Sequence, residues 1–248
     1  MAAQQSSERD EPAVWRSPAK EVIDNALARV VTALATDGER PVQERLACYY
    51  DVDLDYAGAS FAVLPPLVDD DITVSDLHAT TLLSVEIGPA ATRRLLSDGP
   101  VREELLAALH ELRAATLEVT TDDDLSAMAR FYEAVKANLS RPGVSSPNRW
   151  VTASKLCARK RPALFPVRDA VVCGYLGLAG PDASYRRDWL VFRALVREPM
   201  VRDAIDRAVE ATQATTADRR VVLDTARLRL LDAALWTYAI PGSRRSRR

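Results

Sequence analysis

The chain of 248 residues has few of the residues that build metal and redox sites. Its three cysteines, Cys48, Cys157 and Cys173, form no Cys-x-x-Cys pair, which argues against a disulfide framework, an iron–sulfur cluster and a structural zinc. Its two histidines, His78 and His110, stand far apart, which argues against a histidine metal site and a histidine-centred hydrolase. We therefore expect no metal and no cofactor.

Long apolar runs are also missing from the sequence. No uninterrupted apolar stretch approaches the roughly 18 residues of a membrane helix. The first residues, MAAQQSSERDEP, are polar and acidic and lack the apolar core of a secretory signal. Apolar residues make up 48% of the chain and charged residues 27%, which is typical of a globular protein in water. The expected location is the cytoplasm, without a membrane partner.

The net charge of −2 conceals two halves of opposite sign. Residues 1–140 contain 12 basic and 25 acidic residues, whereas residues 141–248 contain 21 basic and 10 acidic residues. A near-neutral total argues against a polyanionic partner, but a basic half of this size is compatible with DNA.

Hydrophobic residues recur with helical spacing almost throughout, and no segment alternates with period two for long enough to form a sheet. The sequence predicts an all-α fold: a single globular helical domain over 18–240, or two packed lobes within it. The acidic lobe would span about 18–140 and the basic lobe about 141–240. The lead 1–17 and the basic tail 241–248 are expected to be disordered.

Several residues mark where the predicted helices begin and end. Ser75 is expected to begin one helix, and Thr121 with Asp124 forms a capping box at the start of another. The break at Arg141-Pro142-Gly143 separates the two halves, and Asn148 is expected to cap the helix that follows. The predicted helices cover about 19–35, a segment after Ser75, a segment after Gly99-Pro100, 122–139, 149–161, 169–178, 184–197, 199–214 and 218–239.

An acidic segment with aromatic neighbours precedes the second of these helices. Asp51-Val-Asp53-Leu-Asp55 begins like a calcium-binding EF-hand loop, but Tyr56 stands where that loop needs glycine and Ala62 where it needs glutamate. We interpret these aspartates as solvated loop residues, with the nearby aromatics docking the loop onto the core. The alternative is that the loop faces the basic half and forms a pocket with it.

The stretch 141–170 carries seven basic residues and one acid. On a helix that starts near residue 149, Thr152, Lys155 and Arg159 fall on one face, and Trp150 on another face that would pack inward. A basic helix face of this kind suits contact with a phosphate backbone. It equally suits a solvated face balanced by the acidic half.

Thr152-Ala153 are followed 17 positions later by Asp169, directly after Phe165-Pro166-Val167-Arg168. This arrangement resembles the helix-hairpin-helix DNA glycosylase superfamily, in which the corresponding aspartate stabilises the oxocarbenium-like sugar or activates water. The resemblance implies a DNA-binding protein and, if an enzyme, a monofunctional DNA N-glycosylase with Asp169 as the catalytic carboxylate. The nucleic-acid-binding residues would be Arg149, Thr152, Lys155, Arg159, Lys160 and Arg168.

The chain departs from that family's pattern at the hairpin. Residues 145–149 lack the two hairpin glycines that let the backbone approach phosphate. Val151 stands where the bifunctional members have their catalytic lysine, so no lyase activity is expected. Under the alternative interpretation, Asp169 is only the N-cap of its helix.

A broader resemblance, over about 50–240, is to an uncharacterised family common in high-GC bacteria. It rests on Tyr56-x-Gly58, Phe61 and Thr81-Leu-Leu-Ser-Val85, and it implies one domain and no known activity. The alternative to a DNA-binding function is therefore a non-catalytic interaction protein or a small-molecule binder. In that case the acidic and basic halves would pair with each other, and head-to-tail pairing would give a homo-oligomer.

Overall fold

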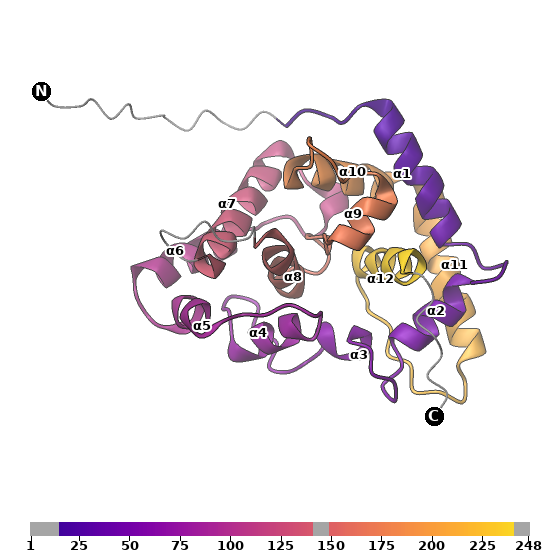
Figure 1. Ribbon diagram of the computed structural model, residues 1–248, viewed down its shortest axis with the longest axis horizontal. Coiled ribbons are helices and arrows are strands. Elements are labelled where there is room, and N and C mark those ends of the chain that lie inside the picture. Colours follow the sequence, from indigo (N-terminus) through magenta and orange to yellow (C-terminus); the bar gives the residue numbers. More distant parts are fainter. Residues whose placement is uncertain (1–14, 141–148, 241–248) are drawn as a thin grey trace, which may run out of the picture.

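The computed structural model describes residues 15–140 and 149–240, and these residues form helices and no β-strand (Figure 1). The predicted all-α fold of a single domain is confirmed, with one continuous hydrophobic core. None of the helices described is both long and apolar enough to cross a membrane. The helices are α1 (Lys20–Ala33), α2 (Val42–Tyr49), α3 (Gly58–Phe61), α4 (Val74–Thr81), α5 (Pro89–Leu96), α6 (Pro100–His110), the 3-10 turn η1 (Leu117–Val119), α7 (Asp122–Leu139), α8 (Trp150–Lys160), α9 (Ala170–Leu176), α10 (Tyr185–Arg197), α11 (Pro199–Thr215) and α12 (Arg227–Ala239).

Capping boxes begin two of the helices. Thr121 caps α7 as predicted: its side chain accepts the backbone N–H of Asp124, and the Asp124 carboxylate accepts the N–H of Thr121 at 2.9 Å. The predicted start of α4 needs a correction, because Thr73 rather than Ser75 is the N-cap and Asp76 is its partner. Ser75 lies in the first turn and donates its hydroxyl to the preceding loop. The break at 141–143 and the cap at Asn148 lie outside the described residues.

The last helix, α12, begins at Arg227, later than predicted. Arg220 therefore lies outside α12, in the segment that precedes it. Arg220 forms an ion pair with Asp53, and Arg227 forms one with Asp206 at 2.8 Å. The segment before α12 is extended enough to form one antiparallel bridge with the end of α2.

Helix packing crosses the expected division at residue 140. The N-terminal helices α1 and α2 pack against α9, α10, α11 and α12, whereas α4, α5 and α6 surround α7 and α8 (Figure 1). The acidic half of the sequence therefore contributes helices to both sides of the molecule. The boundary near residue 140 separates charges along the sequence, and it does not separate two packed halves in space.

Helix α8 occupies the middle of the fold, between α4, α7 and the segment that leads to α9 (Figure 1). Every residue from Thr152 to Lys160 is buried. Leu156 and Cys157 belong to the hydrophobic core, as their positions in the sequence suggest. A helix buried on all sides must satisfy any charge that it carries from within the protein.

Candidate ligand site around Asp169

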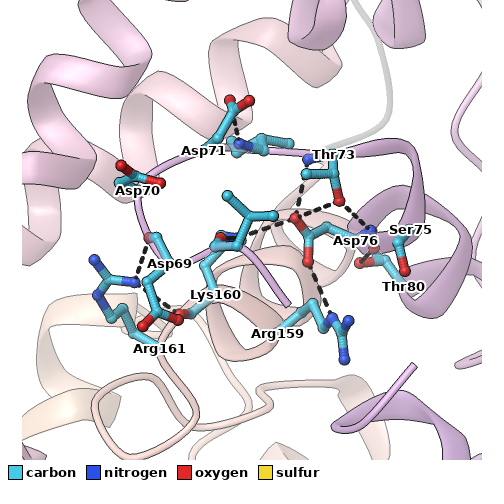
Figure 2. Close-up of polar contacts among 12 residues, drawn as sticks. Asp69, Asp70, Asp71, Thr73, Ser75, Asp76, Thr80, Arg159, Lys160 and Arg161 are labelled. Atoms are coloured by element: carbon cyan, nitrogen blue, oxygen red, sulfur yellow. Dashed lines mark hydrogen bonds and ion pairs between the residues drawn. The ribbon is translucent and has the colours of Figure 1, made fainter. Parts of the chain in front are cut away.

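The basic residues at the end of α8 lie against the acidic segment that leads into α4. Figure 2 shows the Asp76 carboxylate between two cations: Nε of Arg159 is 3.1 Å from Oδ1, and Nζ of Lys160 is 3.0 Å from Oδ2. All three side chains are at most 3% exposed. The backbone N–H of Thr73 donates to Oδ2 at 2.9 Å. Both carboxylate oxygens therefore have partners.

The same two cations also hold the backbone of the loop between α3 and α4. Arg159 donates to the carbonyl of Phe61 at 2.6 Å and to the carbonyl of Leu64. Lys160 donates to the carbonyl of Val68. Carbonyl groups in an irregular segment lack helical partners, so the cations of α8 supply the donors that burial of this loop requires.

The remaining predicted nucleic-acid-binding residues also have internal positions. Arg168 donates to the buried carboxylate of Asp188 at 2.9 Å. Lys155 and Thr152 are buried in α8. Arg149 stands at the N-cap position of α8 and is partly buried.

These placements correct the expectation that α8 turns a basic face toward solvent. Thr152, Lys155 and Arg159 are all buried, and α4 with the loop before it packs against this helix. Arg159 pairs with Asp76 and Lys155 donates to a backbone carbonyl, so both buried cations have partners within the fold. They do not form an exposed stripe that a phosphate backbone would meet.

Asp169 both caps a helix and lines a cavity. Its Oδ1 accepts the backbone N–H of Val172 at 2.8 Å, so the side chain caps α9. The residue is also part of the wall of a cavity of about 390 Å³. Within the described residues its other oxygen, Oδ2, has no hydrogen-bond partner. The structure thus combines the N-cap interpretation with a position at a hollow of ligand size.

The cavity lies where five separate parts of the chain meet: the end of α2 with its following loop, the turn after α4, α8, the start of α9 and α12. Its volume falls in the range of roughly 300–1,000 Å³ that is usual for small-molecule sites. The charged residues in its wall are Asp55, Lys155, Asp169, Arg229 and Asp232. A few charged side chains that converge on a cavity otherwise lined by aromatic and apolar residues are typical of small-molecule sites.

Lys155 holds one wall of this cavity. Its Nζ donates to the carbonyl of Leu83 at 2.6 Å. Burial lowers the pKa of the Lys155 ammonium, and the charge of Asp169 opposes that shift. The next residue, Ser84, has a φ of 59°, in the left-handed region that residues other than glycine rarely adopt. Strained backbone of this kind is often found at ligand sites.

A second charged pair in the cavity wall, Arg229 and Asp232 on α12, was not predicted. Nη1 of Arg229 lies 2.8 Å from Oδ2 of Asp232, and both side chains are 3% exposed. The backbone N–H of Val167, two residues before Asp169, donates to the same oxygen at 2.8 Å. Burial raises the pKa of the Asp232 carboxyl to about 7, against the opposing effect of Arg229.

The sequence does contain a signal for this pair. Arg229 and Asp232 interrupt the otherwise apolar stretch LRLLDAALW at a spacing of one helical turn. Charged residues inside such a stretch are buried only when they have partners or a function. The helical spacing of the apolar residues predicts the helix but does not show what these two charges contact.

Aromatic rings form another part of the cavity wall. The ring of Tyr49 is 5.7 Å from that of Trp236 and 6.0 Å from that of Tyr56, measured between centroids. Gly58 allows the chain to pass close to this group, since a Cβ there would lie 2.3 Å from the Tyr49 carbonyl oxygen. Aromatic faces of this kind suit a flat ring or an organic cation.

The aspartates of the calcium-like pattern have other partners. Asp51 is buried and accepts from Nε of Arg219 at 2.8 Å, so it is not the solvated residue that we expected. Asp53 is exposed, as expected, and forms a surface ion pair with Arg220. Asp55 lies in the cavity wall. In the parts of the chain that the structure describes, no group of three or more Cys, His, Asp or Glu residues is placed to hold a metal ion.

A second cavity, of about 600 Å³, lies between η1, α11 and the start of α12. Its walls contain two ion pairs, Glu118 with Arg202 at 2.9 Å and Asp206 with Arg227 at 2.8 Å. No enclosed polar atom without a partner is found among its described wall residues. The Asp169 cavity is therefore the stronger candidate.

Comparisons with curated proteins and with solved structures find no match. They give no support to the resemblance to helix-hairpin-helix DNA glycosylases, which stays a prediction. A family model described as a family of unknown function, DUF6308, matches residues 42–239. This span contains every residue in the wall of the Asp169 cavity, and it agrees with the expected uncharacterised family. Because the match covers most of the chain, the protein belongs to the DUF6308 family.

Proposed function

We propose that this protein binds a small molecule in the Asp169 cavity. One observation carries the proposal: five charged residues converge on a hollow of ligand size, and polar atoms of two of them, Arg229 and Asp232, are enclosed without a partner in the described residues. Buried polar groups are nearly always hydrogen-bonded, so exceptions need an explanation. A ligand that supplies the missing hydrogen bonds is such an explanation.

Ligand binding can be tested with a defined panel of polar aromatic compounds: adenosine, uridine, nicotinamide and p-aminobenzoate. We expect at least one to raise the melting temperature and to give a measurable Kd by titration calorimetry. Asp169→Asn removes the charge but keeps the cap, because asparagine is a good N-cap residue. It should weaken binding by about tenfold, the usual value of a hydrogen bond to a charged group.

Asp203→Asn is the matched control for this experiment. Asp203 is exposed on α11 and is not part of the cavity wall, so its variant should bind like the wild type. Equal affinities of the wild type and Asp169→Asn, or no binding by any compound, would contradict the proposal.

Hydrolysis of an N-glycosidic bond is the second candidate function. It is supported by the position of Asp169, whose Oδ2 lies uncommitted at a hollow with aromatic walls. A carboxylate there would face the developing positive charge of a sugar whose base is stacked on Tyr49 or Trp236. Most of the predicted phosphate-binding cations are paired internally, so this candidate ranks below simple ligand binding.

Glycosylase activity can be assayed on duplexes that carry uracil, mismatched adenine or an alkylated base, followed by alkali to cleave abasic sites. Strand breaks with the wild type and none with Asp169→Asn would support the second candidate. Binding to undamaged duplex should also weaken by orders of magnitude between low and high salt if phosphate contacts contribute. Breaks that persist in Asp169→Asn would remove this residue from the reaction.

Head-to-tail association through opposite charges has less support. The acidic and basic halves pair within one chain, through Asp76 with Arg159 and through Asp51 with Arg219. These charges are compensated before a second copy approaches. We therefore do not base a function on self-association.

A further inference from the structure

Asp232 uses only half of its hydrogen-bonding capacity. Its Oδ2 accepts two donors, the backbone N–H of Val167 and Nη1 of Arg229, each at 2.8 Å. Its Oδ1 is enclosed and has no partner in the described residues. The two donors fix the orientation of the carboxyl group, so Oδ1 cannot exchange places with Oδ2 without breaking both hydrogen bonds.

An acceptor left in this state is costly to the fold. A buried polar group without a partner lowers stability, and a charged group does so more than a neutral one. The protein has nevertheless placed this carboxyl in the wall of a cavity of about 390 Å³. The unused acceptor belongs to a residue that lines a hollow of ligand size, although Oδ1 itself has almost no accessible surface. A ligand donor would reach it after a small movement of the cavity wall and would then complete its hydrogen bonds.

We propose that Asp232 is a ligand-binding residue of the Asp169 cavity, and that the ligand offers it an N–H donor attached to a flat ring. The inference rests on the proposed function and adds the class of the ligand: an aromatic or heteroaromatic amide or amine.

The position of Trp236 indicates that the ligand contains a flat ring. It follows Asp232 by four residues on α12, so the two side chains lie on the same face, one turn apart. Both are part of the cavity wall. If a ligand ring stacks on Trp236 or Tyr49, an N–H group attached directly to that ring would therefore lie close to the Asp232 carboxyl.

Two neutral probe compounds can test whether the ligand donates an N–H hydrogen bond to Asp232. Benzamide and acetophenone have the same ring and the same carbonyl group, but benzamide has an amino group where acetophenone has a methyl group. Titrations belong at pH 8.5, because burial raises the pKa of Asp232 to about 7 and the acceptor must be ionised. We expect benzamide to bind about tenfold more tightly than acetophenone, the value of one hydrogen bond to a charged acceptor.

The variant Asp232→Asn should remove this preference. Both fixed partners of Oδ2 are donors, so the amide oxygen must take that position and the amino group must replace Oδ1. A donor then faces the ligand, and we expect acetophenone to bind at least as tightly as benzamide. Asp203→Asn, the exposed control, should keep the preference of the wild type.

A measurement on the wild type decides the matter if Asp232→Asn does not fold. The N–H signals of Val167 and of Arg229 Nη1, both of which donate to Asp232, report on its carboxyl by nuclear magnetic resonance. Benzamide should shift both signals more than acetophenone does at equal occupancy.

The outcomes separate this inference from the proposed function. Equal binding of the two probes by the wild type, or an unchanged preference in Asp232→Asn, would overturn the role of Asp232 and leave the cavity as a ligand site. Binding of neither probe at millimolar concentration, together with failure of the compound panel, would overturn both.

Discussion

Asp76 and Asp232 are both buried aspartates beside an arginine, but the protein uses the two carboxylates differently. Asp76 receives Arg159 on one oxygen and Lys160, with the cap of α4, on the other. Asp232 receives all its donors on one oxygen and leaves the other without a partner in the described residues. The first carboxylate is saturated, and the second is not.

This difference separates a cluster that serves the fold from one that we propose serves a ligand. The Asp76 cluster, formed by Asp76, Arg159 and Lys160, joins α4 to α8. None of these three residues is part of the cavity wall. Asp232 is itself part of that wall. Asp188 also leaves one enclosed oxygen without a hydrogen-bond partner in the described residues but lines neither cavity, so the incomplete hydrogen bonds of Asp232 point to a ligand only together with its position in the cavity wall.

Removal of the saturated carboxylate should have the largest effect. Asp76→Ala leaves two buried cations without a counter-charge, and we expect a loss of about 3–5 kcal/mol in the free energy of unfolding. Urea denaturation measures it. Asp206→Ala, which breaks an exposed ion pair, should cost at most about 1 kcal/mol. Equal losses in the two variants would contradict a structural role for the Asp76 cluster.

The unsaturated carboxylate should appear in the pH dependence of stability. The unfolded chain releases the Asp232 proton near the ordinary value of 3.8, whereas the folded protein holds it until about pH 7. The folded state is then favoured most below pH 4, and this contribution is lost as the pH rises toward 7. We expect a decrease on the order of 2 kcal/mol across that window.

Asp232→Asn should flatten the pH profile, measured by urea denaturation at each pH. The other charged and titratable groups near Asp232 are Arg229, Tyr49, Tyr50 and Asp169. All of them are present in both proteins, so the difference between the two profiles isolates Asp232. Parallel profiles would show that its carboxyl does not bind a proton more tightly in the fold.

The capping box that presents Asp76 should give the smallest effect. Thr73→Ala removes the side chain that accepts the Asp76 backbone N–H, and the expected loss is about 1 kcal/mol. Thr81→Ala, at the other end of α4, is the control and should cost less. A larger loss in Thr81→Ala would place the N-cap of α4 elsewhere.

Local rules predicted much of the fold from the sequence. The capping box at Thr121 and the N-cap at Asp169 depend only on residues within one turn, and both are present. Helix α5 (Pro89–Leu96) was missed because Gly88-Pro89 reads equally well as a turn and as a helix start. The correct cap of α4 also had a local signal, because Thr73-x-x-Asp76 repeats the spacing of Thr121-x-x-Asp124 and Ser75 is followed by His78 at that position.

Long-range partners could not be predicted in the same way. Arg159 and Lys160 have the spacing of a phosphate-binding helix, and only the packing of α4 against α8 shows that Asp76 takes both charges. Asp169 was singled out by a resemblance, and its place in the cavity wall keeps it a candidate. Arg229 and Asp232 were not predicted as site residues. Their place in an apolar stretch indicates that they are buried, but the sequence does not show which helix lines a cavity.

The packing of α1 and α2 against α11 and α12 has a consequence for synthesis on the ribosome. Roughly 180 residues separate the end of α2 from the start of α12, so at 5–20 residues per second about 10–40 s pass before the partners exist. During that time the native surface that covers the first two helices is incomplete, because α9, α10 and α11 are synthesised late and α12 last. The apolar faces of α1 and α2 are thus accessible to chaperones while the chain is being synthesised. In a chain truncated before α12 these faces would stay accessible.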